Sequence, residues 1–170
     1  PPYLTMALGA GSVTPMQMAV AYSVFANGGY RTQPYLIDRI VDAHGTLLVQ
    51  AKPKRAGDDA ERAIDARNAF IMTSIMRDVV RFGTGARAMQ LKRQDLAGKT
   101  GTTNDQVDAW FTGFNPGLVA VAWIGFDQPR SMGGAETGAQ AALPIWMGYM
   151  GKALKGVPEA ELVVPEGVAT

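Results

Sequence analysis

The chain has 170 residues, which is long enough for one domain with its own core. Its apolar fraction of 47% and charged fraction of 18% exclude wholesale disorder, and a formal net charge of +1 gives no electrostatic reason to expect a nucleic-acid partner. The absence of cysteine excludes disulfides, thiolate metal sites and a cysteine nucleophile. Because the sequence begins at Pro1 rather than at a methionine, we expect it to be a fragment of a longer protein.

The first predicted element is a helix over residues 15–26. Thr14 and Gln17 have the spacing of a capping box, and Pro15 between them suits the first helical position. The Asn-Gly-Gly sequence at 27–29 ends the helix, because glycine accepts the left-handed conformation that closes helices.

A hairpin is predicted next. Residues 35–41 and 46–49 are rich in branched side chains and flank a turn that contains His44, the only histidine. We interpret His44 as a surface turn residue rather than a catalytic base. Residues 51–63 are polar and predict an exposed loop; its basic cluster at 52–55 is more typical of solvated chain than of a polyanion site.

The rest of the chain predicts a helix, a meander and a second helix. Asp65 can cap a helix that ends near Phe82, and the Asn-Pro-Gly turn at 115–117 predicts an antiparallel hairpin around it. The predicted extended segments are 96–102, 108–114 and 118–126, followed by a helix over 139–154 and a tail over 156–170. Local hairpins separated by helices favour an α+β fold with an antiparallel sheet.

The sequence A-G-K-T-G-T-T at 97–103 has two incompatible interpretations. A phosphate-binding loop needs a glycine five residues before Gly98, but that position is Arg93, and the segment leads into a strand pattern rather than a helix. The alternative is Lys-Thr-Gly, the third motif of serine penicillin-recognising enzymes. Lys99 would attract a substrate carboxylate, Gly101 would leave room for substrate, and the next backbone N–H would face an oxyanion.

The context of this motif resembles the transpeptidase domain of class A penicillin-binding proteins, the bifunctional peptidoglycan synthases, and most closely their 1a-type members. The resemblance covers nearly the whole chain in the family's order. It is carried by G-K-T-G-T-T-N-D-x-x-D-A-W-F-x-G-F, W-I-G-F-D, V-T-P-M-Q-M-A-x-A-Y-x-x-F-A-N-G-G-Y, R-N-A-F-I-M-T-S-I-M, G-T-G and G-A-Q-A-A-L-P-I-W.

The resemblance implies a peptidoglycan D,D-transpeptidase of the serine β-lactamase/penicillin-binding fold, with no cofactor or metal, and with stem peptides and β-lactams as ligands. It implies that Lys99 and the Thr102 N–H act in catalysis and that Thr100 and Gly101 bind substrate. It also implies that Thr103 and Asn104 lie where the family's cleft opens. Trp110 is expected either to wall that cleft or to pack within the sheet.

The nucleophile of the family is absent from the chain. The chain has four serines, none of which begins a Ser-x-x-Lys or Ser-x-Asn sequence: Ser12, Ser23, Ser74 and Ser131. Residues 1–155 are therefore predicted to be the C-terminal part of the domain, inactive without an N-terminal half that supplies the serine. The resemblance further implies a periplasmic setting on the inner membrane, through an N-terminal anchor outside this sequence.

Two alternative functions remain open at this stage. A serine β-lactamase or D,D-carboxypeptidase shares Lys-Thr-Gly, and a non-catalytic β-lactam sensor could keep the fold.

The roles of two smaller groups of residues also depend on the tertiary structure. Asp105 and Asp108 could form a metal or acid–base pair but are expected to be structural. The aromatic residues of the hairpin are expected to serve mostly in core and sheet packing: Trp110, Phe111, Trp123 and Phe126.

Overall fold

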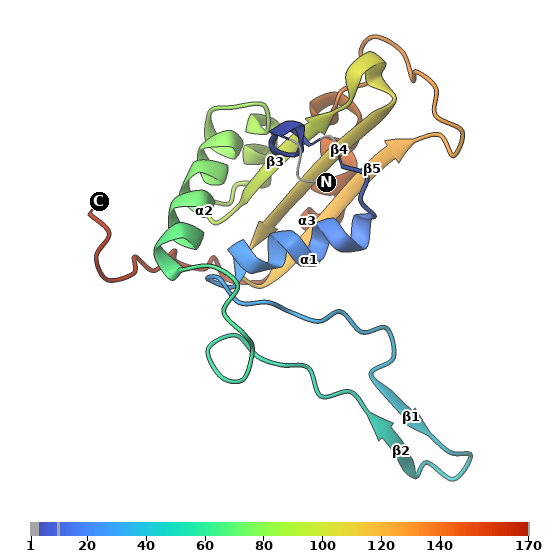
Figure 1. The fold of residues 1–170 in the computed structure, drawn as a ribbon, viewed down its shortest axis with the longest axis vertical. Coiled ribbons are helices and arrows are strands. Elements are labelled where there is room, and N and C mark those ends of the chain that lie inside the picture. Colours follow the sequence, from blue (N-terminus) through green and yellow to red (C-terminus); the bar gives the residue numbers. More distant parts are fainter. Residues whose placement is uncertain (1–3, 10, 170) are drawn as a thin grey trace.

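A computed structural model describes residues 4–9 and 11–169. Figure 1 shows a three-stranded sheet with helices on its faces and a long hairpin that projects away from them. The elements in chain order are η1 (Leu4–Leu8), α1 (Pro15–Ala26), β1 (Arg39–Val41), β2 (Leu47–Gln50), α2 (Ala66–Arg81), η2 (Ala86–Leu91), β3 (Ala97–Thr102), η3 (Asn104–Gln106), β4 (Asp108–Asn115), β5 (Leu118–Gly125), η4 (Gly138–Ala142) and α3 (Leu143–Ala153).

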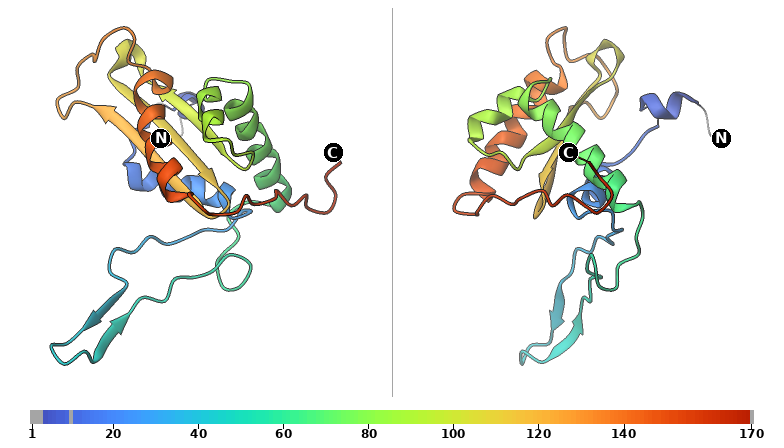
Figure 2. Two further views of the ribbon diagram at one scale, coloured as in Figure 1. Left: turned by 180° about the vertical axis from the view of Figure 1, so that it is seen from behind. Right: turned by 90° about the vertical axis from the view of Figure 1, so that its left-hand side faces the viewer.

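The sheet has the order β3-β4-β5 and is antiparallel throughout, as the sequence predicts. The strands alternate their side chains between two faces. Helix α1 lies across one face, and α3 crosses the other, as the two views from front and back show (Figures 1 and 2). Helix α2 packs beside β3, so the motif strand is bordered by a long helix.

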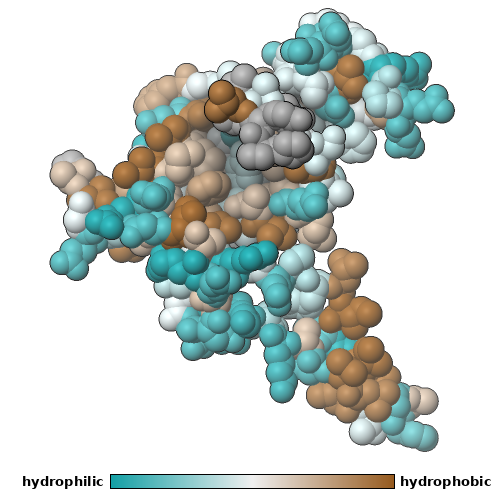
Figure 3. All heavy atoms as spheres, viewed as in Figure 1, coloured by the Kyte–Doolittle hydropathy of each residue, from teal (hydrophilic) through white to brown (hydrophobic). Residues whose placement is uncertain are grey.

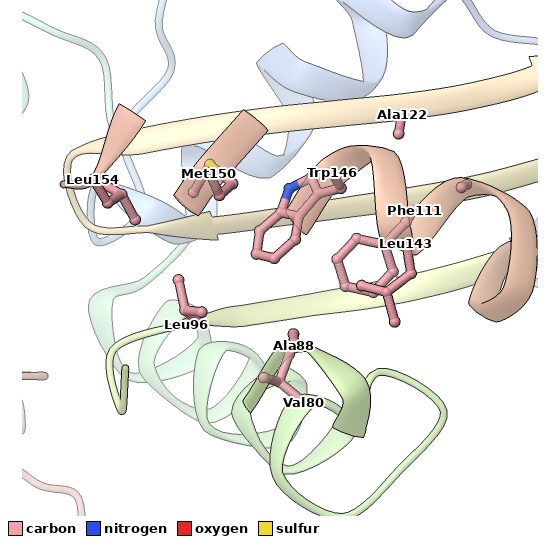
Figure 4. Close-up of a cluster of buried hydrophobic side chains, with 10 residues drawn as sticks. Val80, Ala88, Leu96, Phe111, Ala122, Leu143, Trp146, Met150 and Leu154 are labelled. Atoms are coloured by element: carbon pink, nitrogen blue, oxygen red, sulfur yellow. The ribbon is translucent and has the colours of Figure 1, made fainter. Parts of the chain in front are cut away.

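The main hydrophobic core lies between the sheet and α3 (Figure 4). The rings of Phe111 on β4 and Trp146 on α3 meet edge to face, with centroids 4.9 Å apart. The indole N–H of Trp146 donates to the Gly113 carbonyl oxygen at 3.2 Å, so the one polar group of this large side chain is satisfied. The contact is close because Gly113 has no side chain; a Cβ there would lie 2.6 Å from the Trp146 ring.

Both long helices start where the sequence predicts. The Thr14 side chain accepts a hydrogen bond from the Gln17 N–H at 3.2 Å, and the Gln17 side chain accepts one from the Thr14 N–H at 2.8 Å, which completes the capping box of α1. Asp65 caps α2 through the N–H of Arg67 at 2.9 Å. The last predicted helix differs slightly, because its first turn, η4, is a π-helix that precedes α3.

The hairpin of β1 and β2 is shorter than predicted. The strand expected over residues 35–41 is limited to Arg39–Val41, because β2 supplies partners only for those residues. The hairpin projects from the body, and hydrophobic residues gather on it (Figures 1 and 3). These side chains are exposed in the described structure: Ile40, Val41, Leu47, Leu48 and Val49.

The start of the tail is fastened to the turn before β3 by a buried ion pair. Arg93 donates to both carboxylate oxygens of Asp95, at 2.8 and 2.7 Å, and also to the backbone oxygens of Val157 and Pro158. Asp95 also accepts the N–H of Ala160 at 3.2 Å. Breaking one partner of a buried pair leaves the other charge uncompensated, so this pair is expected to matter for stability.

We expect Asp95→Asn to lower the free energy of unfolding by about 3 kcal/mol, because it leaves the Arg93 guanidinium without its counter-ion. Asp65→Asn is the matched control. It removes an ion pair with Arg67 whose side chains are 48% and 56% exposed, and it keeps a capping side chain, so its effect should be small. Urea unfolding followed by tryptophan fluorescence measures both; equal effects would contradict the prediction.

Acid should remove the contribution of Asp95. Burial raises the pKa of this carboxyl, but hydrogen bonds from Arg93, Ala160 and Asn115 outweigh that effect and hold the pKa below its ordinary value of 3.8. A carboxyl whose pKa is lower in the folded state than in the unfolded state stabilises the protein at pH values above its unfolded-state pKa. This stabilisation is lost as the pH falls through the folded-state pKa. The difference in unfolding free energy between the unsubstituted protein and Asp95→Asn should therefore narrow below pH 3.8.

Candidate active site

The Lys-Thr-Gly motif lies on β3, which pairs with β4 on one side and has no strand partner on the other among residues 4–9 and 11–169. Lys99 is opposite Thr112, and Gly101 is opposite Trp110. Directly opposed residues share a face. Phe111, the residue opposite Thr100, is buried in the core on the α3 side, so Thr100 faces that side. Lys99 and Gly101, its neighbours along the strand, therefore face the α1 side.

The register of β3 determines which backbone groups face the open edge. The Thr103 N–H donates to the Asp108 carbonyl at 3.0 Å, so this pair belongs to the hydrogen-bonded set of the ladder. Such pairs alternate along antiparallel strands. Thr100 and Thr102 therefore direct their backbone N–H and C=O groups away from β4. The ammonium of Lys99 donates to the Thr100 carbonyl at 2.9 Å, as expected for an oxygen on the open edge.

Both motif threonines have hydroxyls with fixed neighbours. The Thr102 hydroxyl accepts a hydrogen bond from the Gly138 N–H at 3.0 Å. Since that hydroxyl accepts from the protein, its own hydrogen remains available to an acceptor in the cleft. The Thr100 hydroxyl lies 2.7 Å from that of Thr84, which follows the end of α2.

Gly138 allows η4 to approach the motif strand. A Cβ at this position would collide with the Trp110 carbonyl oxygen and lie within 2.5 Å of that of Gly101. Because glycine removes the obstacle, the first turn of η4 lies directly on the backbone of β3 and β4. This contact is what brings the Gly138 N–H to the Thr102 hydroxyl.

A pair of indoles stands beside the motif. Trp110 and Trp123 lie opposite each other on β4 and β5, with ring centroids 5.9 Å apart. The Trp123 N–H donates to an Asp108 carboxylate oxygen at 2.7 Å, and the Asp108 N–H donates to the Thr103 hydroxyl at 2.7 Å. Asp108 is thus a structural residue that links the end of β3 to the indole pair.

The motif and the indoles line one cleft of about 600 Å³. Its remaining wall includes Met18 and Tyr22 of α1. Burial raises the pKa of the Tyr22 hydroxyl, so the phenol stays protonated at neutral pH. Cationic, hydroxyl and aromatic groups therefore meet in one space of the size that small ligands and peptides occupy.

Comparison with known proteins identifies the family. Residues 2–145 match the penicillin binding protein transpeptidase domain. The chain belongs to this family. Penicillin-binding protein 1A of Neisseria flavescens is 55% identical over 170 residues, which are 100% of this chain and 21% of that protein. Penicillin-binding protein 1A of Pseudomonas aeruginosa is 43% identical, with 100% of this chain and 26% of that protein covered. The chain thus spans about a fifth of the first relative and a quarter of the second.

Solved structures agree with the α+β penicillin-binding transpeptidase fold expected from the sequence. The crystal structure of penicillin-binding protein 1A from Haemophilus influenzae matches with a TM-score of 0.90 and 37% identity, over 95% of this chain and 29% of that one. Penicillin-binding protein A from Mycobacterium tuberculosis, 24% identical, shares the fold with a TM-score of 0.61 over 84% of this chain and 32% of that one.

The transpeptidase fold brings together six of the seven site residues that the sequence predicts. The cleft is lined by Lys99, Thr100, Gly101, Thr102, Thr103 and Trp110. Asn104 begins η3 and is not among the lining residues. Of the serines, Ser12 lines the cleft, but the residue three positions after it is Pro15.

Sequence reasoning missed other residues that line the cleft or contact the motif. Trp123 was expected to pack in the core or on the sheet; it does pack on the sheet against Trp110, but it is also 38% exposed and lines the cleft. Phe126 is 41% exposed, and of the four hairpin aromatics Phe111 is the one that is fully buried. Thr84 and Gly138 were also missed as neighbours of the motif. Both lie in segments that carry the family resemblance, G-T-G and G-A-Q, which was the available signal.

His44, Asp105 and Asp108 were expected to be structural rather than catalytic, and the contacts of His44 and Asp108 agree with this expectation. His44 lies in the turn of the projecting hairpin, where its N–H donates to Asp42. Asp105 and Asp108 are not joined by a third side chain, since no group of three or more His, Cys, Asp and Glu residues comes together in the described part of the chain.

We expect Gly138→Ala to destabilise the protein by about 1–3 kcal/mol, because the new methyl group would push η4 off the backbone of β3 and β4. Gly148→Ala is the matched control within α3. A Cβ there meets nothing within 4 Å, so alanine should be neutral or stabilising by about 0.5–1 kcal/mol. Thermal unfolding measures both, and a neutral Gly138→Ala would refute the close packing.

Proposed function

We propose that residues 1–155 are the C-terminal part of a peptidoglycan D,D-transpeptidase domain and that residues 156–170 are its tail. The open edge of β3 carries this proposal. There Lys99, Thr100 and Thr102 line one cleft, the Lys99 ammonium lies 3.4 Å from the Thr100 hydroxyl, and the Thr102 N–H faces the open edge. Acyl transfer from a peptide with a terminal carboxylate needs such a combination of cationic, hydroxyl and backbone donors.

In the proposed reaction, a serine from the N-terminal part of the domain attacks the penultimate D-alanine carbonyl of a donor stem peptide. The serine loses its proton, the bond between the two D-alanines breaks, and the terminal D-alanine leaves as the protonated amine. The amine of a second stem peptide then attacks the acyl-serine, which forms the cross-link and returns a proton to the serine. No cofactor takes part in these steps, because the serine, the incoming amine and the donors of the protein supply every group that reacts.

Each motif residue has a separate role in this reaction. Lys99 attracts the terminal carboxylate of the donor, and the hydroxyls of Thr100 and Thr102 donate hydrogen bonds to it. The Thr102 N–H is one of two donors to the oxyanion, and Gly101 leaves the strand clear for the peptide. Trp110, with Thr103 and Asn104 at the mouth, contacts the rest of the stem peptide. A β-lactam enters the same way, since it also pairs a carboxylate with a reactive acyl group.

The serine is proposed to come from a preceding segment of the longer protein, the N-terminal half of the same domain. Two observations support a partner segment on the α1 side of the sheet, and a third supports further strands beside β5. The cleft opens beside α1. Strand β5 has no second strand partner among residues 4–9 and 11–169, so its edge could accept another strand. The buried Thr112 hydroxyl, also on the α1 side, has no hydrogen-bond partner in the described part of the chain. A buried unpaired hydroxyl is costly, so a packed segment that satisfies it would stabilise the domain.

The proposed setting is the periplasmic side of the bacterial inner membrane, where peptidoglycan is assembled. In the described part of the chain, no helix is both long and apolar enough to cross a membrane. We propose that a single N-terminal anchor in the longer protein holds the domain at the membrane. Accessibility of a tag at the chain's C-terminus to an impermeant reagent tests this placement.

Lys99→Ala should slow acylation of the reconstituted domain by a fluorescent penicillin about 100-fold, because the carboxylate loses its cationic partner. The second-order rate constant of acylation is the measurement. Lys155→Ala is the control, since Lys155 is exposed and does not line the cleft. An unchanged rate for Lys99→Ala would refute the role of this lysine. Rapid release of hydrolysed penicillin from the unsubstituted domain would favour a β-lactamase.

The chain alone should form no covalent adduct with penicillin. No serine in it is followed three residues later by lysine, so none has the expected activating partner. Intact-protein mass spectrometry after incubation with penicillin is the measurement. An adduct on any of the four serines, and on Ser12 in particular because it lines the cleft, would show that the nucleophile had been misassigned.

A further inference from the structure

The Gly83-Thr84-Gly85 turn holds Thr84 in one place. The N–H groups of Gly83 and Gly85 both donate to the Val79 carbonyl, at 3.1 and 3.0 Å, which folds the chain back over the end of α2. Gly85 is buried, and a Cβ there would lie 3.4 Å from the Phe111 ring and 3.2 Å from the Val79 oxygen. The turn is therefore fixed against both α2 and β4, and the residue between the glycines is positioned accurately.

The Thr84 side chain extends from this turn to the motif strand. Its hydroxyl oxygen lies 2.7 Å from that of Thr100, and either oxygen could be the donor in the free protein. The same Thr100 oxygen lies 3.4 Å from the Lys99 ammonium nitrogen. A hydroxyl has one hydrogen to donate and two lone pairs, whereas an ammonium can only donate.

We propose that Thr84 is a positioning residue that donates its hydrogen to Thr100 and so directs the Thr100 hydrogen toward the substrate carboxylate. This inference rests on the proposed function of the cleft. A carboxylate can only accept, so Thr100 must be the donor to it and Thr84 must be the donor within the threonine pair. Donation from Thr84 also polarises the Thr100 hydroxyl, which strengthens the hydrogen bond that this hydroxyl gives.

The second motif threonine has the same arrangement with a different donor. The Gly138 N–H donates to the Thr102 hydroxyl at 3.0 Å, which occupies a lone pair and leaves the Thr102 hydrogen free. Each motif hydroxyl therefore has a donor supplied from outside the strand, by the turn after α2 for Thr100 and by η4 for Thr102. The donor that Thr84 supplies is a side-chain hydroxyl, whereas the donor that Gly138 supplies is a backbone N–H. A substitution at Thr84 can therefore remove the donor without changing the backbone.

The test compares four variants in the complete transpeptidase domain: Thr84→Val, Thr84→Ser, Thr100→Val, and Thr84→Val with Thr100→Val. The probes are a penicillin with its free carboxylate and the methyl ester of the same penicillin, and the readout is the second-order rate constant of acylation. Valine keeps the shape of threonine without the hydroxyl, and serine keeps the hydroxyl. Thermal unfolding of each variant reports on the fold.

We expect Thr84→Val to slow acylation by the free carboxylate about 5–10-fold, as for loss of a hydrogen bond that supports a charged contact. Thr84→Ser should restore the rate to within about twofold, and acylation by the ester should be insensitive to Thr84→Val. In the Thr100→Val background, Thr84→Val should have no further effect, since the two hydroxyls act as one unit.

Other results would overturn the inference in distinguishable ways. An unchanged rate for Thr84→Val, or an equal loss with the ester, would show that Thr84 does not act through the carboxylate. Additive losses in the double variant would show that it does not act through Thr100. If the unsubstituted domain were not acylated at all, the proposed function would fail together with this inference.

Discussion

The candidate site depends on the antiparallel register of β3 against β4. This register places Lys99 and Gly101 on one face, and it turns the backbone groups of Thr100 and Thr102 to the open edge. A shift by one residue would reverse both assignments, because side chains and ladder hydrogen bonds each alternate with a period of two. The cation, the hydroxyls and the edge-facing N–H groups therefore become a site only in this register.

Close packing on the α3 side of the sheet fixes this register. Trp146 reaches the backbone of Gly113, and η4 reaches that of β3 through Gly138. Both contacts require glycine, since a methyl group at either position would collide with its neighbour. A sheet held so firmly from one side can present a rigid edge and a cleft on the other, which is the preorganisation that acyl transfer needs.

Much of this arrangement was predictable, and the failures have physical causes. The caps at Thr14 and Asp65 determine helix starts locally, so both long helices were predicted well. The strand at 35–41 was predicted too long, because branched residues favour extended chain but only a partner strand determines its length. Trp123 was expected to pack in the core or on the sheet, but its place in the cleft wall was not predicted, because that place depends on its packing against Trp110 and its hydrogen bond to Asp108.

The sequence by itself determined the family, the motif strand and the absence of a Ser-x-x-Lys nucleophile, because these are properties of residue order. It also located the segments that hold Thr84 and Gly138 but could not connect them to the motif. Tertiary structure decided that connection: Thr84 is 16 residues from Thr100, and Gly138 is 36 residues from Thr102. Such contacts depend on how α2 and η4 pack on the sheet, and no local pattern encodes a distance between separate elements.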